Sequence, residues 1–307
     1  LVQILKVRGG SSWDTARESP LAEIGLNVKD GEWIRAVDGK SLAEVSNIAE
    51  LLVNKVGKEV KLTLSATPEA KDTRTITVVP IASEADLYYH DWVEGNLAKV
   101  NKATGGDVGY LHVPDMLQNG LNQFAKYYYP QLTKKALIVD MRGNGGGNVS
   151  PMLIERLRRE AIMITVARNS VPRFDPPNVM GPMCCLLNEF SASDGDLFPF
   201  RFRAHGLGKL IGKRSWGGVV GIRGTLPLLD GGTLNRPEFS RYDLGGKEWI
   251  IEGVGVSPDM VVDNDPAREF AGEDQQLDTA IKHMLEEMKT KAKKIPPLPP
   301  SPKRAGE

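Results

Sequence analysis

The chain has 307 residues, of which 41% are hydrophobic and 25% charged, and its 39 Lys and Arg balance its 39 Asp and Glu. This length suits two domains, each with a buried core of its own. The balanced charge excludes the broad basic surface that binds nucleic acid or anionic membranes. No apolar run approaches the roughly 20 residues that a membrane-spanning helix needs.

Residues 1–82 predict a small β-rich domain in which strand-like runs alternate with turns. The dipeptides Asp30-Gly31 and Asp38-Gly39 bracket the alternating strand WIRAV, and a short helix-like run, NIAELLVNK, follows. This succession of turn, strand, VDG and helix resembles a PDZ domain, a class that binds chain ends by adding them as a strand to a sheet edge. The resemblance implies a PDZ-like peptide-binding domain. A structural spacer that binds no ligand fits the same pattern.

Residues 83–292 change to alternating strands and helices. The runs DVGYLHV, ALIVD, MCCLL and KLIG are short and apolar, and helix-like segments separate them. Such alternation predicts crossover connections and a parallel or mixed sheet covered by helices. A last helix is expected over residues 275–291, and residues 293–307, rich in proline, predict a disordered tail. The apolar face of that helix comprises Leu277, Ile281, Met284, Leu285 and Met288.

The segment VDMRGNGGGNVSPMLIERL runs from a strand through four glycines into a helix, with Ser150 as the expected N-cap and Pro151 at the first helical position. Glycines let backbone N–H groups approach a ligand closely, and the helix end adds partial positive charge, so this loop favours an anion. Neither G-x-x-x-x-G-K-[ST] nor G-x-G-x-x-G is present, so a transient oxyanion is a better candidate ligand for this loop than a nucleotide. A flexible turn without a ligand is the alternative.

The segment NEFSASDGDLF follows the apolar strand MCCLL and places Ser193 at a strand-to-helix junction, with Asp194 and Asp196 in the first helical turn. At such a junction the N–H of Asp194 can join the N–H of Gly147 in holding an oxyanion beside a serine nucleophile. Position 191 is Ser, so the G-x-S-x-G elbow of α/β-hydrolases is excluded. The alternative is that Ser193 is an ordinary N-cap.

Four histidines compete for the role of general base. His205 lies twelve residues beyond Ser193 on the same predicted helix, about 18 Å away. His283 belongs to the last helix beside two glutamates, and the sequence around His90 indicates no role for that residue. His112 ends the strand GYLHV, where sites gather in sheets of this kind, and it is the one candidate base inside the chain.

Four ordered motifs, NGGGNVS, NEFSASDGDLF, LGKLIGKRSWGGVVG and EGVGVSPD, together resemble the tail-specific (C-terminal processing) serine peptidases, and within that family the tricorn branch. The resemblance covers nearly the whole chain. It implies an α/β fold in which a ClpP/crotonase-like sandwich, the catalytic domain of residues 83–292, follows the small PDZ domain of residues 1–82.

The two branches of this family use different bases. The processing peptidases use a Ser-Lys pair, but Gly218 occupies their lysine position here and Lys213 is offset from the motif. The tricorn branch uses a histidine that a glutamate orients through a hydroxyl, and Glu252 occupies the glutamate position. That histidine precedes the PDZ domain in the family. The chain begins with Leu1 inside a strand, so we expect a longer protein whose base lies upstream, and we expect residues 1–307 alone to be nearly inactive.

One position departs from the tricorn pattern. An aspartate that favours basic side chains before the cut corresponds to Thr165, and a small neutral hydroxyl cannot pair with Lys or Arg. The resemblance therefore implies a weakened preference for basic residues.

The sequence as a whole predicts a cytoplasmic serine endopeptidase acting on peptide substrates. The adjacent cysteines Cys184 and Cys185 fit a reducing compartment. No cofactor or metal is expected. The resemblance implies a homo-oligomer and β-propeller domains upstream. The rival from another class is a non-catalytic peptide-binding scaffold with a degenerate protease fold. A Ser-Lys peptidase with a displaced lysine is a third reading.

Overall fold

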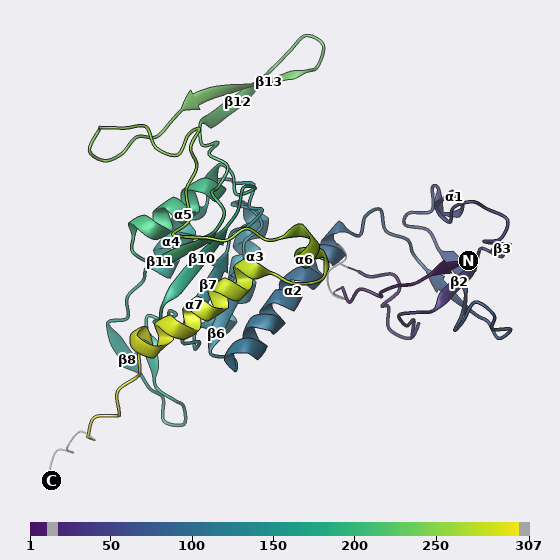
Figure 1. The fold of residues 1–307 in the computed structure, drawn as a ribbon, viewed down its shortest axis with the longest axis horizontal. Helices are drawn as coiled ribbons and strands as arrows, with labels where there is room; N and C mark the ends of the chain where they lie inside the picture. The colour runs from purple at the N-terminus through teal and green to yellow at the C-terminus, as the bar shows by residue number, and fades with distance from the viewer. Residues whose placement is uncertain (11–17, 301–307) are drawn as a thin grey trace. The chain divides into compact units, whose positions relative to one another are not determined.

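The computed structural model describes residues 1–10 and 18–300, apart from the side chains of residues 223–226, so the last part of the predicted tail, 301–307, lies outside the described residues. The chain divides into two compact units, Leu1–Gly95 and Asn96–Glu307 (Figure 1). The division falls inside helix α2 (Ala85–Thr104), whereas the sequence predicted a boundary at residue 82.

The first unit is built on an antiparallel sheet with the strand order β1-β2-β4-β5, to which β3 adds beside β2. Its short helix α1 spans Ala49–Leu52. The strands are β1 (Val2–Gln3), β2 (Trp33–Val37), β3 (Lys40–Ser41), β4 (Val60–Ser65) and β5 (Arg74–Val78). The predicted strands in the middle of the unit are confirmed, but the runs LVQILKV and NIAELLVNK form much shorter elements than expected.

A two-residue turn joins β2 to β3 and fixes their register. Asp38 and Gly39 both have positive φ, 49° and 79°, which is the conformation that a right-twisted hairpin requires. The core beneath the sheet consists of apolar side chains from alternate strand positions. Its buried members are Ile4, Ile34, Val37, Leu42, Val60, Leu62, Leu64, Ile76 and Val78.

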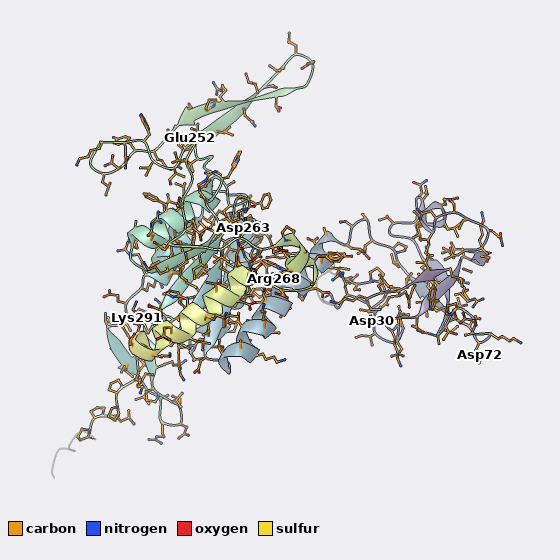
Figure 2. All side chains as sticks on the ribbon, viewed as in Figure 1. Asp30, Asp72, Glu252, Asp263, Arg268 and Lys291 are labelled. Carbon is orange, nitrogen blue, oxygen red and sulfur yellow. The ribbon has the colours of Figure 1, made fainter. Side chains whose placement is uncertain are left out.

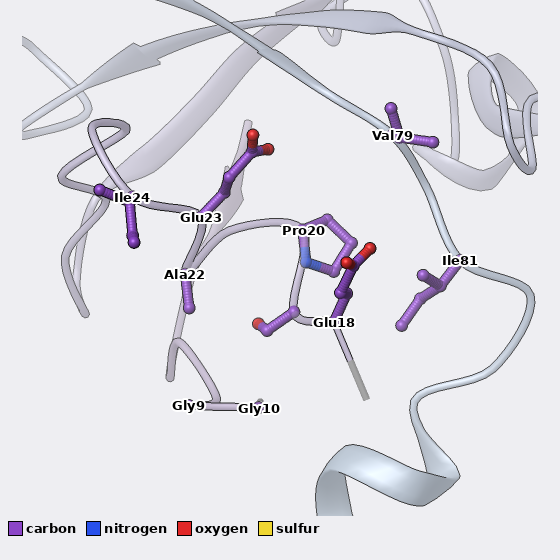
Figure 3. Close-up of a pocket in the computed structure, with 10 residues that line it drawn as sticks. Gly9, Gly10, Glu18, Pro20, Ala22, Glu23, Ile24, Val79 and Ile81 are labelled. Carbon is purple, nitrogen blue, oxygen red and sulfur yellow. The ribbon is translucent and has the colours of Figure 1, made fainter. Parts of the chain in front are cut away.

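A cavity of about 640 Å³ opens on the first unit (Figure 3). Pro20, Ala22, Val79 and Ile81 give it apolar walls, and Glu18 and Glu23 add carboxylates. All of its lining residues belong to the first unit, whereas every predicted peptidase residue belongs to the second.

The second unit contains a parallel sheet with the strand order β14-β11-β10-β7-β6. Each strand pairs with the next one in chain order, and β6, β7 and β10 are buried along their whole length, as strands covered on both faces must be. The predicted parallel sheet is confirmed. Its strands are β6 (Val108–His112), β7 (Ala136–Asp140), β10 (Met183–Leu187), β11 (Gly208–Gly212) and β14 (Met260–Val261).

Helices in the crossovers and the last helix cover this sheet. Helix α7 (Gln275–Lys291) lies along the sheet and contacts four of its strands (Figure 1). Its predicted apolar face is confirmed at Leu277, Ile281 and Met284, but Leu285 is 37% exposed. The other helices are α3 (Gln118–Tyr128), the 3-10 turn η2 (Tyr129–Gln131), α4 (Ser150–Leu157), α5 (Asp194–Ala204) and α6 (Pro266–Phe270).

Two hairpins and the helices α2 and α6 were not predicted. Strands β8 (Met163–Thr165) and β9 (Arg173–Asp175) form the first hairpin, and β12 (Gly221–Pro227) and β13 (Thr233–Phe239) form the second. The apolar residues of helix α2 form no clear stripe. These elements explain why the strand count exceeds the sequence expectation.

The carboxyl ends of the parallel strands meet at one edge of the sheet, and three loops emerge there. The glycine loop, residues 141–149, follows β7. The serine turn, residues 188–193, follows β10, and the segment 213–220 follows β11. This edge is where ligands usually bind in open parallel sheets.

Candidate active site

Ser193 lies between β10 and α5 in a backbone conformation that is costly for any residue except glycine. Its φ and ψ are 56° and −119°, and its side chain is exposed. It stands at the N-cap position of α5, but its hydroxyl makes no capping hydrogen bond. The hydroxyl is therefore available to solvent or substrate.

The glycine loop packs directly against this serine. A Cβ built on Gly146 would lie 2.6 Å from the Cβ of Ser193 and 2.9 Å from the amide nitrogen of Asp194, far inside normal contact distance. Gly146 also has a φ of +98°, so both space and backbone conformation require glycine here.

The two amides predicted to hold an oxyanion come from this contact. A parallel bridge joins Met116 to Gly147 and uses the carbonyl of Gly146 and the N–H of Asn148. The N–H of Gly147 belongs to the same trans peptide as the Gly146 carbonyl, so it points away from Met116. Across the described part of the chain, neither this N–H nor that of Asp194 has a hydrogen-bond acceptor.

The carboxylate of Asp194 has a separate task at the start of α4. It accepts hydrogen bonds from the backbone N–H and the hydroxyl of Ser150, at 2.8 and 2.5 Å, and from Arg201 at 3.1 Å. The prediction of Ser150 as N-cap is wrong, because the helix begins at this residue and the preceding Val149 makes no side-chain cap. The cap comes instead from Asp194, which ties the helix after the glycine loop to the serine turn.

Two carboxylates hold the segment 215–220 beside the serine turn. Asp196 Oδ1 accepts the N–H of Gly217 at 2.8 Å, and Glu252 Oε2 accepts the N–H groups of Val219 and Val220 at 2.7 and 2.8 Å. Figure 2 shows Glu252 at the base of the hairpin β12–β13. Glu252 therefore contacts backbone amides.

Asp196 is fully buried, and its Oδ2 accepts no hydrogen bond from the described residues. Burial raises the pKa of this carboxyl, and the hydrogen bonds around it counter that shift in part. A buried carboxylate with one oxygen unpartnered is costly to the folded state.

A strained turn presents Glu252. Ile251 has a φ of 71°, and the N–H of Glu252 donates to the carbonyl of Ile250 at 2.8 Å, which closes a γ-turn around a β-branched residue. Turns of this hand are rare and strained. Glu252 itself lies in a turn.

The structure does not bring His112 to Ser193. His112 is buried at the end of β6, and its Nε2 donates to the carbonyl of Arg142 at 2.8 Å. Burial lowers its pKa, so the ring is neutral at physiological pH. This arrangement is that of a structural histidine.

Lys213 is likewise engaged elsewhere. Its ammonium lies 2.8 Å from Glu189 and 3.2 Å from Asp263. Its hydrogen bonds to Glu189 and Asp263 raise its pKa, which makes it a poorer base. Gly218, at the lysine position of the processing peptidases, offers no side chain.

Thr165 lies away from the serine turn. Helix α4 starts beside the glycine loop and ends at Leu157. The carbonyl of Leu157 accepts a hydrogen bond from Asn178, and this contact lies at the opposite end of the sheet, where Pro182 bonds to the start of β7. Figure 1 shows β8 at this end of the unit, remote from the hairpin β12–β13. Thr165 donates to Asp175 at 2.7 Å, and one copy of the chain does not bring it to Ser193.

A buried charged network, which the sequence did not reveal, stands behind the glycine loop. Arg142 binds Asp140 through two nitrogens, with distances of 2.7 to 3.1 Å, and reaches Asp274 at 2.9 Å. Burial alone would raise the pKa of Asp140, but the attraction and hydrogen bonds of Arg142 lower it. The one sign of this network in the sequence was that Asp140 and Arg142 stand two positions apart at the end of a strand.

Comparison with known proteins shows the family to which the chain belongs. The chain matches peptidase family S41 over residues 107–262 and the tricorn protease PDZ domain over residues 2–83. The chain therefore belongs to peptidase family S41, a family of serine-type peptidases, with a PDZ domain before the catalytic domain.

Within that family the chain is similar to the C-terminal region of the tricorn proteases. It is 37% identical to tricorn protease homolog 1 of Streptomyces coelicolor, over 97% of this chain and 28% of that protein. Tricorn protease of Thermoplasma acidophilum is 36% identical, over 96% of this chain and 27% of the relative. The crystal structure of tricorn protease superposes with a TM-score of 0.86 at 35% identity, over 93% of this chain and 28% of that one. The chain thus spans less than a third of these relatives.

Two kinds of feature are absent from the described residues. No helix among them is long and apolar enough to cross a membrane. In the same ranges, 1–10 and 18–300, no group of three or more His, Cys, Asp or Glu side chains is arranged to hold a metal ion.

Proposed function

We propose that this chain is the catalytic part of a serine endopeptidase that hydrolyses oligopeptides through an acyl-enzyme at Ser193. The observation that carries the proposal is the contact between the exposed, strained Ser193 and the glycine loop, which leaves two N–H groups without an acceptor among the described residues. Membership of family S41 supports the reaction class.

In the proposed reaction, Ser193 Oγ attacks the carbonyl carbon of the scissile peptide bond while a general base removes its proton. The N–H groups of Gly147 and Asp194 stabilise the oxyanion of the tetrahedral intermediate, and each such donor contributes about two to three orders of magnitude to turnover. The amine leaves with the proton from the base, and water then hydrolyses the ester.

The base in this proposal is a histidine upstream of Leu1. His112, the candidate base that the sequence offered inside the chain, does not supply it, since it is buried and bonded to a carbonyl. Glu252 is proposed to orient the base through a hydroxyl, using the oxygen that does not bind the amides of segment 215–220. Without the base, residues 1–307 retain only weak residual catalysis.

A fluorophosphonate tests both parts of the proposal. Intact mass is measured after incubation of this chain, and of a longer protein that includes the sequence encoded upstream of Leu1. We expect rapid labelling of Ser193 only in the longer protein, abolished by Ser193→Ala. Labelling of this chain alone would place the base inside it and make His112→Ala the next variant. Labelling of neither would overturn the peptidase proposal.

The second candidate is a peptide-binding scaffold without catalysis. Its support is the lack of a base among the described histidines and the PDZ domain of the first unit. A scaffold has no need for a strained serine next to unpaired amides. The two functions separate in one experiment, because a scaffold binds peptides with equal affinity whether residue 193 is Ser or Ala and never forms an acyl-enzyme.

Substrate preference, partners and location are further parts of this proposal. Thr165 lies away from Ser193 of its own chain, so this part of the proposal requires that a second copy of the chain places Thr165 beside the cut site. There it cannot pair with a basic side chain, so we expect apolar and mixed residues before the cut, and a fluorogenic panel with strong Lys or Arg preference would contradict this. We propose a cytoplasmic homo-oligomer with β-propeller domains upstream. The two buried free cysteines support the cytoplasm.

A further inference from the structure

Asn144, inside the glycine loop, has every polar atom engaged. It is fully buried, and its hydrogen bonds reach two segments that are distant in sequence, at Val113 and at Ala192. Its Nδ2 donates to the carbonyl of Val113 at 2.8 Å, and its Oδ1 accepts the N–H of Gly146 at 2.9 Å. Its backbone carbonyl accepts the N–H of Ala192 at 2.9 Å, one residue before Ser193.

These contacts determine which amide of the loop is available. Asn144 occupies the N–H of Gly146, and Met116 donates to the carbonyl of Gly146 at 2.8 Å. With both faces of Gly146 fixed, the N–H of the next residue, Gly147, has one direction left, away from Met116. Asn144 therefore decides that the second amide of the loop, and not the first, is offered to a ligand.

The same residue fixes the distance between the loop and the nucleophile. A Cβ on Gly195 would lie 2.2 Å from the carbonyl oxygen of Asn144, so the first turn of α5 packs on this carbonyl without a gap. The bond from Ala192 holds the other side of Ser193. A shift of Asn144 would move both oxyanion donors relative to Ser193 Oγ.

We infer that Asn144 is a positioning residue of the oxyanion hole: it locks the glycine loop so that the N–H of Gly147 faces the tetrahedral intermediate at Ser193. This inference rests on the proposed function. Asn144 touches no substrate and acts through Gly146 and Ala192. The oxyanion exists only in the transition state and intermediates. Removal of the Asn144 side chain should therefore lower kcat and leave KM nearly unchanged.

The test uses the longer protein and compares Asn144→Ala with Asn148→Ala, a matched change of the same residue type in the same loop, where the exposed side chain has no such contacts. Peptide hydrolysis gives kcat and KM, and a peptide aldehyde, which forms a reversible hemiacetal with Ser193, reports the oxyanion hole. We expect Asn144→Ala to lower kcat and aldehyde affinity about 10²-fold or more, with KM within about threefold. Asn148→Ala should match the wild type.

Asn144→Asp provides a second test of the inference if the alanine variant fails to fold. The carboxylate oxygen facing Val113 repels that carbonyl, but a protonated Asp can donate to it as Asn does. Aldehyde affinity relative to wild type should therefore rise as pH falls, a dependence that a merely structural role would not produce. An affinity ratio that does not change with pH, or an Asn144→Ala variant equal to Asn148→Ala, would overturn the inference. A wild-type protein that neither hydrolyses peptides nor labels at Ser193 would overturn the proposed function itself.

Discussion

Replacement of Gly146 by alanine should disable Ser193 while leaving the fold in place. The new Cβ would lie 2.6 Å from the Cβ of Ser193 and 2.8 Å from the carbonyl oxygen of Ala192, where carbon atoms normally stay about 3.5–4.0 Å apart. The loop or the serine turn must therefore move by about 1 Å. The φ of +98° adds about 1–3 kcal/mol of backbone strain.

A displacement of that size costs about 10²-fold in rate, and loss of one oxyanion donor costs 10²–10³-fold. We expect the rate constant for fluorophosphonate labelling of Ser193, in the longer protein, to fall at least about 10²-fold. The free energy of unfolding should fall by roughly the strain alone, about 1–3 kcal/mol, because the loop lies at the edge of the sheet. Intact mass and thermal unfolding measure the two effects.

Two neighbouring glycines separate the causes. A Cβ on Gly145 meets nothing within 4 Å, and its φ is not in the left-handed region, so Gly145→Ala should label within about threefold of wild type. A Cβ on Gly143 also meets nothing, but its φ is +72°, so Gly143→Ala carries backbone strain without the contact. If Gly146→Ala labels as fast as Gly145→Ala, the contact between loop and nucleophile has no catalytic meaning.

Three further predictions concern buried and paired charges. Asp140→Asn leaves Arg142 buried beside a neutral amide and should cost about 3–5 kcal/mol in urea unfolding, whereas Asp107→Asn, in an exposed pair, should cost under about 1 kcal/mol; equal losses would contradict this. Burial raises the pKa of Asp196, so its ionised form destabilises the folded state above the unfolded pKa of about 3.9. The stability of Asp196→Asn relative to wild type should therefore increase as pH rises from about 4, and a difference that is constant with pH would count against it. Lys213→Ala should leave Ser193 labelling in the longer protein intact, since the ammonium is paired with two carboxylates, and abolished labelling would revive the Ser-Lys reading.

The sequence predicted the parts of the fold that periodicity controls. The buried strands β6, β7 and β10 appear as continuous apolar runs because both of their faces are covered. Helix α2 escaped prediction because its apolar residues form no clear stripe, with Leu87, Val93 and Val100 as widely spaced buried positions. The hairpin β12–β13 escaped because β13 is exposed on both faces, so no alternation toward a core exists.

The candidate site was predictable only where the backbone itself determines the chemistry. Glycines in a row and a serine at a strand-to-helix junction are visible in the sequence. The positioning role of Asn144 cannot be seen in the sequence, because it depends on hydrogen bonds to Val113, Gly146 and Ala192 that form only in the tertiary fold. The capping of α4 by Asp194 is hidden for the same reason, since the cap lies 44 positions away from the helix start.

Backbone strain in the described residues is distributed in a way that favours catalysis over passive binding. Five residues other than glycine have positive φ, and the three in the first unit are Asn or Asp, for which this conformation is cheap. The two in the second unit are Ser193 and Ile251, a serine and a β-branched residue, for which it costs about 1–3 kcal/mol each. Both adjoin the segment 215–220: the carbonyl of Ser191 accepts the N–H of Trp216, and the γ-turn at Ile251 presents Glu252 to that segment. Strain that converges on one loop persists because the surrounding hydrogen bonds enforce it, and a surface that only bound peptides would gain stability by releasing it.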